Sequence, residues 1–234
     1  MPKKTLLSWS SGKDSAWALQ VLRRRIDLEV VGLVTTLNEV HQRVAIHGVR
    51  RQLLEHQAEA VGLPLHIVDL PSPCSNDEYE CAMRSLISET RDSGVECMAF
   101  GDLFLEDIRR YREEKMAGTG MAPLFPLWKM DTRLLANEMI GQGLRAYVSC
   151  LDPKTVPAGF AGREFDHELL RSLPPDVDPC GENGEFHTFA FDGPMFAQPL
   201  RIAPGEVVER DGFVYADLLL QNRERPESNT QELS

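Results

Sequence analysis

The segment Ser-Ser-Gly-Lys-Asp-Ser, at positions 10–15, separates a short apolar run from a stretch with helical spacing. Small residues at the end of a strand let backbone N–H groups approach an anion closely, and the positive end of the following helix adds to the attraction. A lysine supplies a mobile charge, and a serine supplies a hydroxyl group. A turn followed by a capped helix would have a similar composition. We predict a phosphate-binding loop made of Ser10, Ser11, Gly12, Lys13, Asp14 and Ser15.

Two roles fit Asp14, and the sequence does not separate them. Its carboxylate can cap the N-terminus of the following helix, or it can help to hold a magnesium ion beside the phosphates. The loop lacks the spacing of the G-x-x-x-x-G-K-[ST] and G-x-G-x-x-G motifs. It is therefore neither a Walker loop nor a Rossmann fingerprint.

A second group of reactive side chains lies in the segment Cys-Gly-Glu-Asn-Gly-Glu-Phe, at residues 180–186. Its two glutamates lie among glycines, which let the backbone approach a ligand closely. Their carboxylates can orient a substrate or act as general bases. A plain turn between two strands would use the same glycine and asparagine residues. The candidate residues of this block are Gly181, Glu182, Asn183, Gly184 and Glu185.

Strands and helices alternate along the first half of the chain, as in a doubly wound parallel sheet. Apolar runs bounded by charges or turns predict strands at residues 5–9, 28–37, 65–70 and 96–101. Apolar residues at helical spacing predict helices at residues 15–25, 49–61, 77–92 and 105–115. We therefore expect an α/β domain at residues 1–125, with ligands bound beyond the carboxyl ends of its strands.

The rest of the chain has a different pattern, in which proline and glycine become frequent. A helix is predicted at residues 131–144, and strands are predicted at residues 145–151, 186–191 and 213–220. This pattern favours a second, smaller α+β domain at residues 126–222. The polar residues 223–234 are predicted to form a disordered tail.

Composition and charge restrict the class of protein. The net charge of −11 argues against nucleic acid as a partner, because such binding depends chiefly on neutralising phosphates. No apolar run of about 18 residues and no signal-peptide pattern occurs, so we expect no membrane span and a cytoplasmic location. The five cysteines contain no Cys-x-x-Cys pair, and we expect reduced thiols.

The loop at residues 10–15 resembles the S-G-G-x-D-S pyrophosphate-binding loop of the PP-loop ATP pyrophosphatases. Further blocks resemble, in the same order, those of the diphthine-ammonia ligase family within that superfamily. These blocks lie at residues 47–65, 101–114, 125–146, 160–166 and 178–196. The resemblance extends over most of the chain.

The resemblance implies a fold and a reaction. It implies that five parallel strands form the ATP-binding domain and that a family-specific domain follows. It also implies that a substrate carboxylate attacks the α-phosphorus of ATP, that pyrophosphate leaves into the loop, and that ammonia then displaces AMP to form an amide. ATP and Mg²⁺ are the expected cofactors, with Asp14 as the expected metal ligand. The expected catalytic residues are Lys13, Asp14, Glu182 and Glu185.

The same resemblance adds candidate contacts for the nucleotide and the substrate. Adenosine is expected across the strand ends, although ordinary strand termini would have similar residues. The candidates there are Thr35, Thr36, Gly101 and Asp102. His47 opens a family-like block after a loop and is a further candidate. Gly162 and Arg163 are candidate substrate contacts, because a guanidinium can bind a phosphate or a carboxylate. An ion pair of Arg163 with Glu164 or Asp166 is the alternative.

Three residues depart from the family pattern. Ser11 and Asn183 replace glycines, and His187 replaces an acidic residue. Since the last two lie where the second substrate is expected, the carboxylate is left open: it belongs to a protein similar to elongation factor 2 or to a small metabolite. A nucleotide-binding regulatory module without turnover, or a PP-loop enzyme acting on another substrate such as tRNA, is the alternative. A homodimer is also left open.

Overall fold

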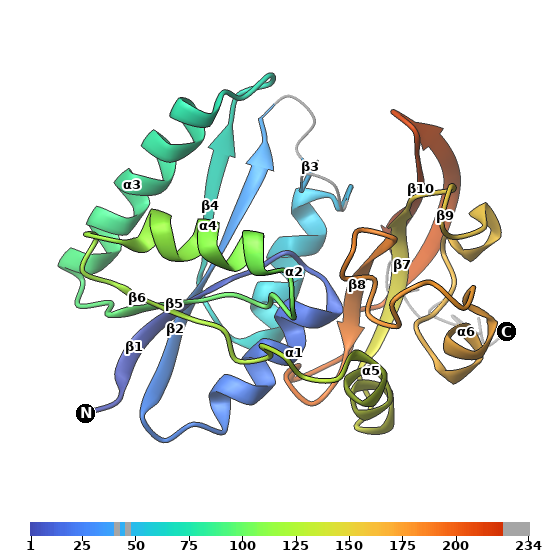
Figure 1. The fold of residues 1–234 in the computed structure, drawn as a ribbon, viewed down its shortest axis with the longest axis horizontal. Helices are drawn as coiled ribbons and strands as arrows, with labels where there is room; N and C mark the ends of the chain where they lie inside the picture. The colour runs from blue at the N-terminus through green and yellow to red at the C-terminus, as the bar shows by residue number, and fades with distance from the viewer. Residues whose placement is uncertain (40–42, 45–47, 222–234) are drawn as a thin grey trace, which may run out of the picture.

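Two β-sheets lie side by side in the computed structural model, which describes residues 1–39, 43–44 and 48–221 (Figure 1). The first sheet consists of β1 (Lys3–Ser8), β2 (Leu28–Asn38), β3 (Arg43–Val44), β4 (Leu65–Leu70), β5 (Cys97–Ala99) and β6 (Ala122–Leu124). Five of these strands are parallel, in the order β4-β2-β1-β5-β6. The short β3 pairs antiparallel with the end of β2.

Helices cover both faces of this sheet. They are α1 (Lys13–Arg23), α2 (Arg51–Val61), α3 (Asn76–Asp92) and α4 (Glu106–Met116). Leu7 and Leu33 belong to the apolar cluster of α1 and α2, whereas the alternate residues Leu6 and Val34 belong to the cluster of α3. Because successive strand residues point to opposite faces, the apolar strands are buried on both sides. The predicted doubly wound α/β class is confirmed.

The strand order reverses next to β1. The chain passes from β1 to β2 and β4 on one side, and then returns to β5 on the other side of β1. In open α/β sheets, ligands bind in the crevice outside the carboxyl ends of the strands at such a reversal. The segments that follow β1 and β5 therefore border the expected ligand crevice.

The second sheet is antiparallel, with the order β8-β7-β10-β9. Its strands and accompanying helices are α5 (Thr132–Gly141), β7 (Arg145–Leu151), η1 (Ala158–Phe160), α6 (His167–Ser172), β8 (Phe186–Asp192), β9 (Ile202–Arg210) and β10 (Phe213–Leu220). The strands predicted at residues 145–151, 186–191 and 213–220 are confirmed. Sequence analysis missed β9, where Pro204 and Gly205 interrupt the apolar pattern, and the very short β3 and β6.

The edge strand β8 joins the second sheet to the phosphate-binding loop, and Figure 1 shows it as the strand of that sheet nearest to α1. The Ala190 N–H donates to the Ser11 carbonyl oxygen at 2.9 Å. The Lys13 N–H donates to the Thr188 hydroxyl oxygen at 3.0 Å. One apolar cluster runs through α1, α2, α5 and the second sheet. The loop is therefore held from both sheets.

Gln57, on α2, also connects the loop after β1 to β8. Its side chain is fully buried. Its Nε2 donates to the carbonyl oxygens of Ser11, at 3.0 Å, and Ala190, and its Oε1 accepts from the Trp9 indole N–H at 2.9 Å. One amide group thus satisfies buried polar atoms from β8 and from the loop after β1.

Four expectations concern the whole chain. The domain boundary at residue 125 stays a prediction, and the predicted tail at residues 223–234 lies outside the described residues. The helices within the described ranges all lack the length and apolar composition that crossing a membrane requires. The cysteines are free thiols, as predicted.

Replacing Gln57 by leucine is expected to lower the free energy of unfolding by about 3 kcal/mol, because several buried polar groups lose their partner. The exposed Gln52 lies on the same helix, and Gln52→Leu is the matched control. Its effect is expected to stay within about 0.5 kcal/mol. Urea denaturation followed by circular dichroism measures both variants, and equal losses would contradict the connecting role of Gln57.

Candidate active site

The loop that follows β1 turns through one residue with left-handed backbone. Ser11 has a φ of 72°, its side chain is buried, and its Oγ has no hydrogen-bond partner among the described residues. The Ser15 hydroxyl donates to the Gly12 carbonyl oxygen at 2.9 Å. Gly12 is the N-cap of α1, and Asp14 lies in the first turn of the helix. The metal-ligand role considered for Asp14 stays a prediction.

A cavity of about 270 Å³ lies beyond the carboxyl ends of β1 and β5, where the strand order reverses. Small-molecule sites usually measure ~300–1,000 Å³, so this cavity suits one end of a nucleotide. The predicted site residues that line it are Ser10, Lys13, Asp14, Ser15, Gly101, Asp102, Gly181 and Glu182. Lining residues that sequence analysis did not assign include Ser8, Phe100, Arg112, Cys180, His187 and Thr188.

Lys13 is almost fully buried, with 1% of its surface exposed. Its Nζ donates to Asp14 Oδ2 at 2.9 Å and to the Cys180 carbonyl oxygen, and it lies 5.5 and 5.4 Å from the ring centroids of Phe165 and Phe186. Burial by itself lowers the pKa of Lys13, but the attraction of Asp14 and other acids outweighs this effect. The pKa of Lys13 therefore lies above its ordinary value, and the side chain is charged.

Two carboxylates in the cavity have oxygens without hydrogen-bond partners. Asp14 Oδ1 and Asp102 Oδ2 are both buried, and neither has a hydrogen bond with a described residue. Burial raises the pKa of Asp102, while Arg112, whose Nε lies 3.5 Å from Oδ2, opposes the rise. Carboxylate oxygens are the ligands that Mg²⁺ prefers, so this pair fits a divalent cation. Among the described residues no group of three or more His, Cys, Asp or Glu could hold a metal ion, so waters or phosphate oxygens would complete the coordination.

Glu182 reaches the cavity from the segment before β8. Its Oε1 accepts hydrogen bonds from the backbone N–H groups of Leu103, at 2.7 Å, and Phe104, at 3.4 Å. Burial raises the pKa of Glu182 to about 7, against the opposing effect of the Leu103 hydrogen bond. The carboxyl group is thus close to half-ionised at neutral pH and can take up a proton there.

Two further side chains of the cavity wall are neutral at physiological pH. Burial lowers the pKa of His187 to about 4, and Lys13 adds to this effect. Burial also raises the pKa of the Cys180 thiol. In the sequence, only its departure from the family pattern distinguishes His187, and no local signal places Cys180 in the site.

Glu185 and Asn183 do not line the cavity. Glu185 is buried, and its Oε1 accepts from the Asp178 N–H at 3.0 Å and from Asn183 Nδ2 at 2.9 Å. These bonds stabilise the turn that presents Glu182. A direct catalytic role for Glu185 stays a prediction, and its contacts favour a supporting role.

Glycines allow the two segments around the cavity to approach closely. Gly181 has a φ of 69°, and a Cβ there would lie 2.6 Å from the Phe186 carbonyl oxygen. A Cβ at Gly101 would lie 3.2 Å from the Asp14 carbonyl carbon. The end of β5 therefore packs directly against the start of α1. Gly184 also has a positive φ, of 87°, in the turn before β8.

Some predicted nucleotide contacts lie away from the cavity wall: Ser11, Gly12, Thr35 and Thr36. Thr35 is buried, and its hydroxyl donates to the Trp9 carbonyl oxygen, so it stabilises the strand end. A contact of Thr35 or Thr36 with adenosine stays a prediction. His47 lies outside the described residues.

Arg163 and Gly162 also lie outside the cavity wall. The Arg163 guanidinium stacks over the Phe160 ring at 4.7 Å, and its Nη2 lies 3.8 Å from Glu168 Oε1. The ion pair therefore forms with Glu168 rather than with either acid considered from the sequence. The structure does not bring Arg163 to the predicted phosphate site.

Comparison with known proteins gives consistent matches along both parts of the chain. Residues 3–122 match the family model of the diphthamide synthase N-terminal domain, and residues 131–217 match that of the C-terminal domain. The chain is 32% identical to the diphthine–ammonia ligase of Danio rerio over 203 residues, which cover 78% of each chain. It is 28% and 26% identical to those of Bos taurus and Homo sapiens, over 76% of this chain and 70% of each relative.

These matches include the loop after β1, the strand ends that border the cavity, and the segment that contributes Glu182. They agree with the α/β fold and with a phosphate-binding loop at the reversal of strand order. The chain belongs to the diphthamide synthase family, and it is an ATP-dependent ligase.

Proposed function

We propose that the protein forms an amide from a substrate carboxylate and ammonia in two steps. First, a carboxylate oxygen attacks the α-phosphorus of ATP, the bond between that phosphorus and the bridging oxygen breaks, and pyrophosphate leaves. Ammonia then attacks the carbonyl carbon of the acyl-adenylate, the C–O bond breaks, AMP leaves, and one proton passes to a base. The observation that carries this proposal is the cavity in which the phosphate-binding loop and Glu182 meet.

The loop and Lys13 would stabilise the charge of the departing pyrophosphate. Preorganised donors in a buried site stabilise developing charge more strongly than water does. Lys13 is charged and held in place by two hydrogen bonds. Asp14 and Asp102 would hold Mg²⁺, which neutralises phosphate charge when it is bound.

Glu182 would act as the general base of the second step. Ammonia loses a proton as it becomes an amide, and a carboxylate with a pKa of about 7 can accept that proton at neutral pH. The two backbone N–H groups on Oε1 fix the carboxylate plane, and the side chain lines the cavity. Glu185 would stabilise the turn that carries Glu182, through its hydrogen bonds with the Asp178 N–H and with Asn183 Nδ2.

Diphthine is the proposed carboxylate, because the relatives are named diphthine–ammonia ligases. A protein similar to elongation factor 2 would present it, and a small carboxylate is the second candidate because His187 alters the cavity wall. The cytoplasm is the proposed compartment. Sulfur transfer to tRNA is not favoured, because Cys150 is fully buried with a pKa raised to about 11. The Cys180 thiol is also buried, and its pKa is raised too.

The reaction is tested by mixing the protein with ATP, Mg²⁺, ammonium and either diphthine-bearing elongation factor 2 or a panel of small carboxylates. AMP and pyrophosphate are the expected products. Lys13→Met is expected to lower their formation about 10²-fold or more, since it removes the buried charge. Formation of ADP and phosphate would exclude the proposed reaction.

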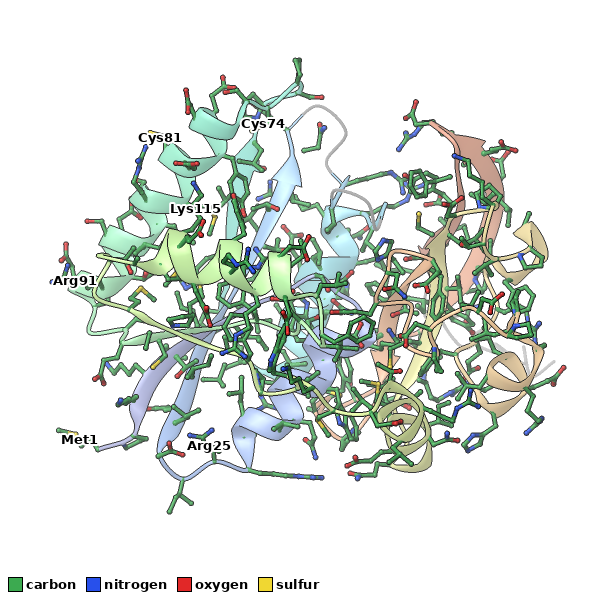
Figure 2. The ribbon with its side chains drawn as sticks, viewed as in Figure 1. Met1, Arg25, Cys74, Cys81, Arg91 and Lys115 are labelled. Atoms are coloured by element: carbon green, nitrogen blue, oxygen red, sulfur yellow. The ribbon has the colours of Figure 1, made fainter. Side chains whose placement is uncertain are left out.

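Lys115→Met is the matched control for that variant. Lys115, which is labelled in Figure 2, lies on α4. It pairs with Glu80 of α3 and does not line the cavity. It is expected to retain the rate of the unaltered protein. Thermal unfolding of both variants checks that each is folded.

The rate of amide formation is expected to rise with pH through about 7 and to level off above it. Below this value Glu182 is protonated and cannot accept the proton, and above it the carboxylate is ionised. In Glu182→Gln the side-chain oxygen can still accept the hydrogen bond from the Leu103 N–H. This variant should lose the rise of the rate with pH, and its kcat should fall about 10²-fold. The profile is measured with unprotonated ammonia held constant at each pH. If the rate of the variant still rises with pH through about 7, Glu182 is not the base.

A further inference from the structure

Arg112 lies on α4 between two hollows of the molecule. It lines the candidate active-site cavity, and it also lines a groove of about 580 Å³ between α3 and α4. Phe100, at the end of β5, borders both hollows as well. Arg112 thus reaches the site from α4, whereas Glu182 reaches it from the segment before β8.

The cavity has few positively charged side chains that could bind an anionic ligand. Its carboxylates come from Asp14, Asp102 and Glu182. Among the described residues that line it, the lysine and arginine side chains are Lys13 and Arg112. Lys13 already donates to Asp14 and to a backbone carbonyl, with only 1% of its surface exposed. Arg112 is therefore the cation with capacity for a new contact.

The contacts of Arg112 fix its guanidinium plane but do not use its Nε. The guanidinium carbon lies 4.8 Å from the centroid of the Phe100 ring, which sets the orientation of the group. Nε is buried and has no hydrogen bond with any residue that the structure describes. It lies 3.5 Å from Asp102 Oδ2, which is also buried without one. Buried polar atoms in native proteins usually have a hydrogen-bond partner, so these two atoms call for one.

We infer that Arg112 binds a phosphate group of the nucleotide, in the role that sequence analysis considered for Arg163. A guanidinium presents several N–H groups in one plane, which matches the oxygens of a phosphate. Stacking on Phe100 holds that plane in place before the ligand arrives. The inference rests on the proposed function, because it requires ATP in this cavity.

The test compares nucleotide affinity with nucleoside affinity. Isothermal titration calorimetry measures binding of α,β-methylene-ATP with Mg²⁺, and of adenosine, to the unaltered protein and to the Arg112→Gln and Arg112→Lys variants. Arg112→Gln is expected to bind the nucleotide about tenfold more weakly or worse, since it loses a charged hydrogen bond. Adenosine affinity is expected to stay the same, and Arg112→Lys should lie between.

Arg109→Gln is the matched control. Arg109 lies on the same helix, but it pairs with Glu113 at 2.7 Å, stacks over Phe125 and Trp128, and does not line the cavity. It is expected to bind both ligands like the unaltered protein. Thermal unfolding of all variants checks that each is folded.

The remaining outcomes separate the two proposals. Failure of the unaltered protein to bind the nucleotide would overturn the proposed function. Unchanged nucleotide affinity in Arg112→Gln would overturn the role of Arg112 alone, whether or not the KM of the carboxylate substrate rises. An equal loss of nucleotide and adenosine affinity would show a structural role and would also overturn the inference.

Discussion

The Ser11 carbonyl oxygen is the point on which the site depends. It accepts hydrogen bonds from the Ala190 N–H, at 2.9 Å, and from Gln57, at 3.0 Å. Ser11 has left-handed backbone, and Ala190, its partner, belongs to β8. Because buried carbonyl groups need partners, the loop after β1 takes its shape only with the second sheet in place. The phosphate-binding loop is therefore a product of both parts of the chain.

Burial of the cavity then gives its side chains unequal charge. Removing water disfavours every charged form, so the pKa of Glu182 rises and that of His187 falls. Lys13 escapes this effect because Asp14 lies 2.9 Å away. One buried space thus contains a fixed cation, a carboxyl group that titrates near neutral pH, and a neutral imidazole. These are the charges that a leaving pyrophosphate and an incoming ammonia require in the proposed reaction.

The two sheets contribute different chemistry to the same cavity. The first supplies the loop after β1, and its β5 end supplies Asp102 and the N–H groups that hold Glu182. The second supplies β8 and the turn before it. Arg112, on α4, contributes a third part of the cavity wall.

The sequence by itself determined the fold class, most of the long strands and helices, and the position of the loop after β1, for which phosphate binding stays a prediction. Those features follow from local periodicity and from residue types within short segments. Tertiary structure alone decided that Glu182 rather than Glu185, and Arg112 rather than Arg163, line the cavity. It also decided that Cys180 and His187 lie beside Lys13. The reason is that the cavity is lined by a turn, a helix and a strand that are far apart in the sequence. Which of their side chains line it depends on how these elements pack, and local sequence patterns carry no information about that packing.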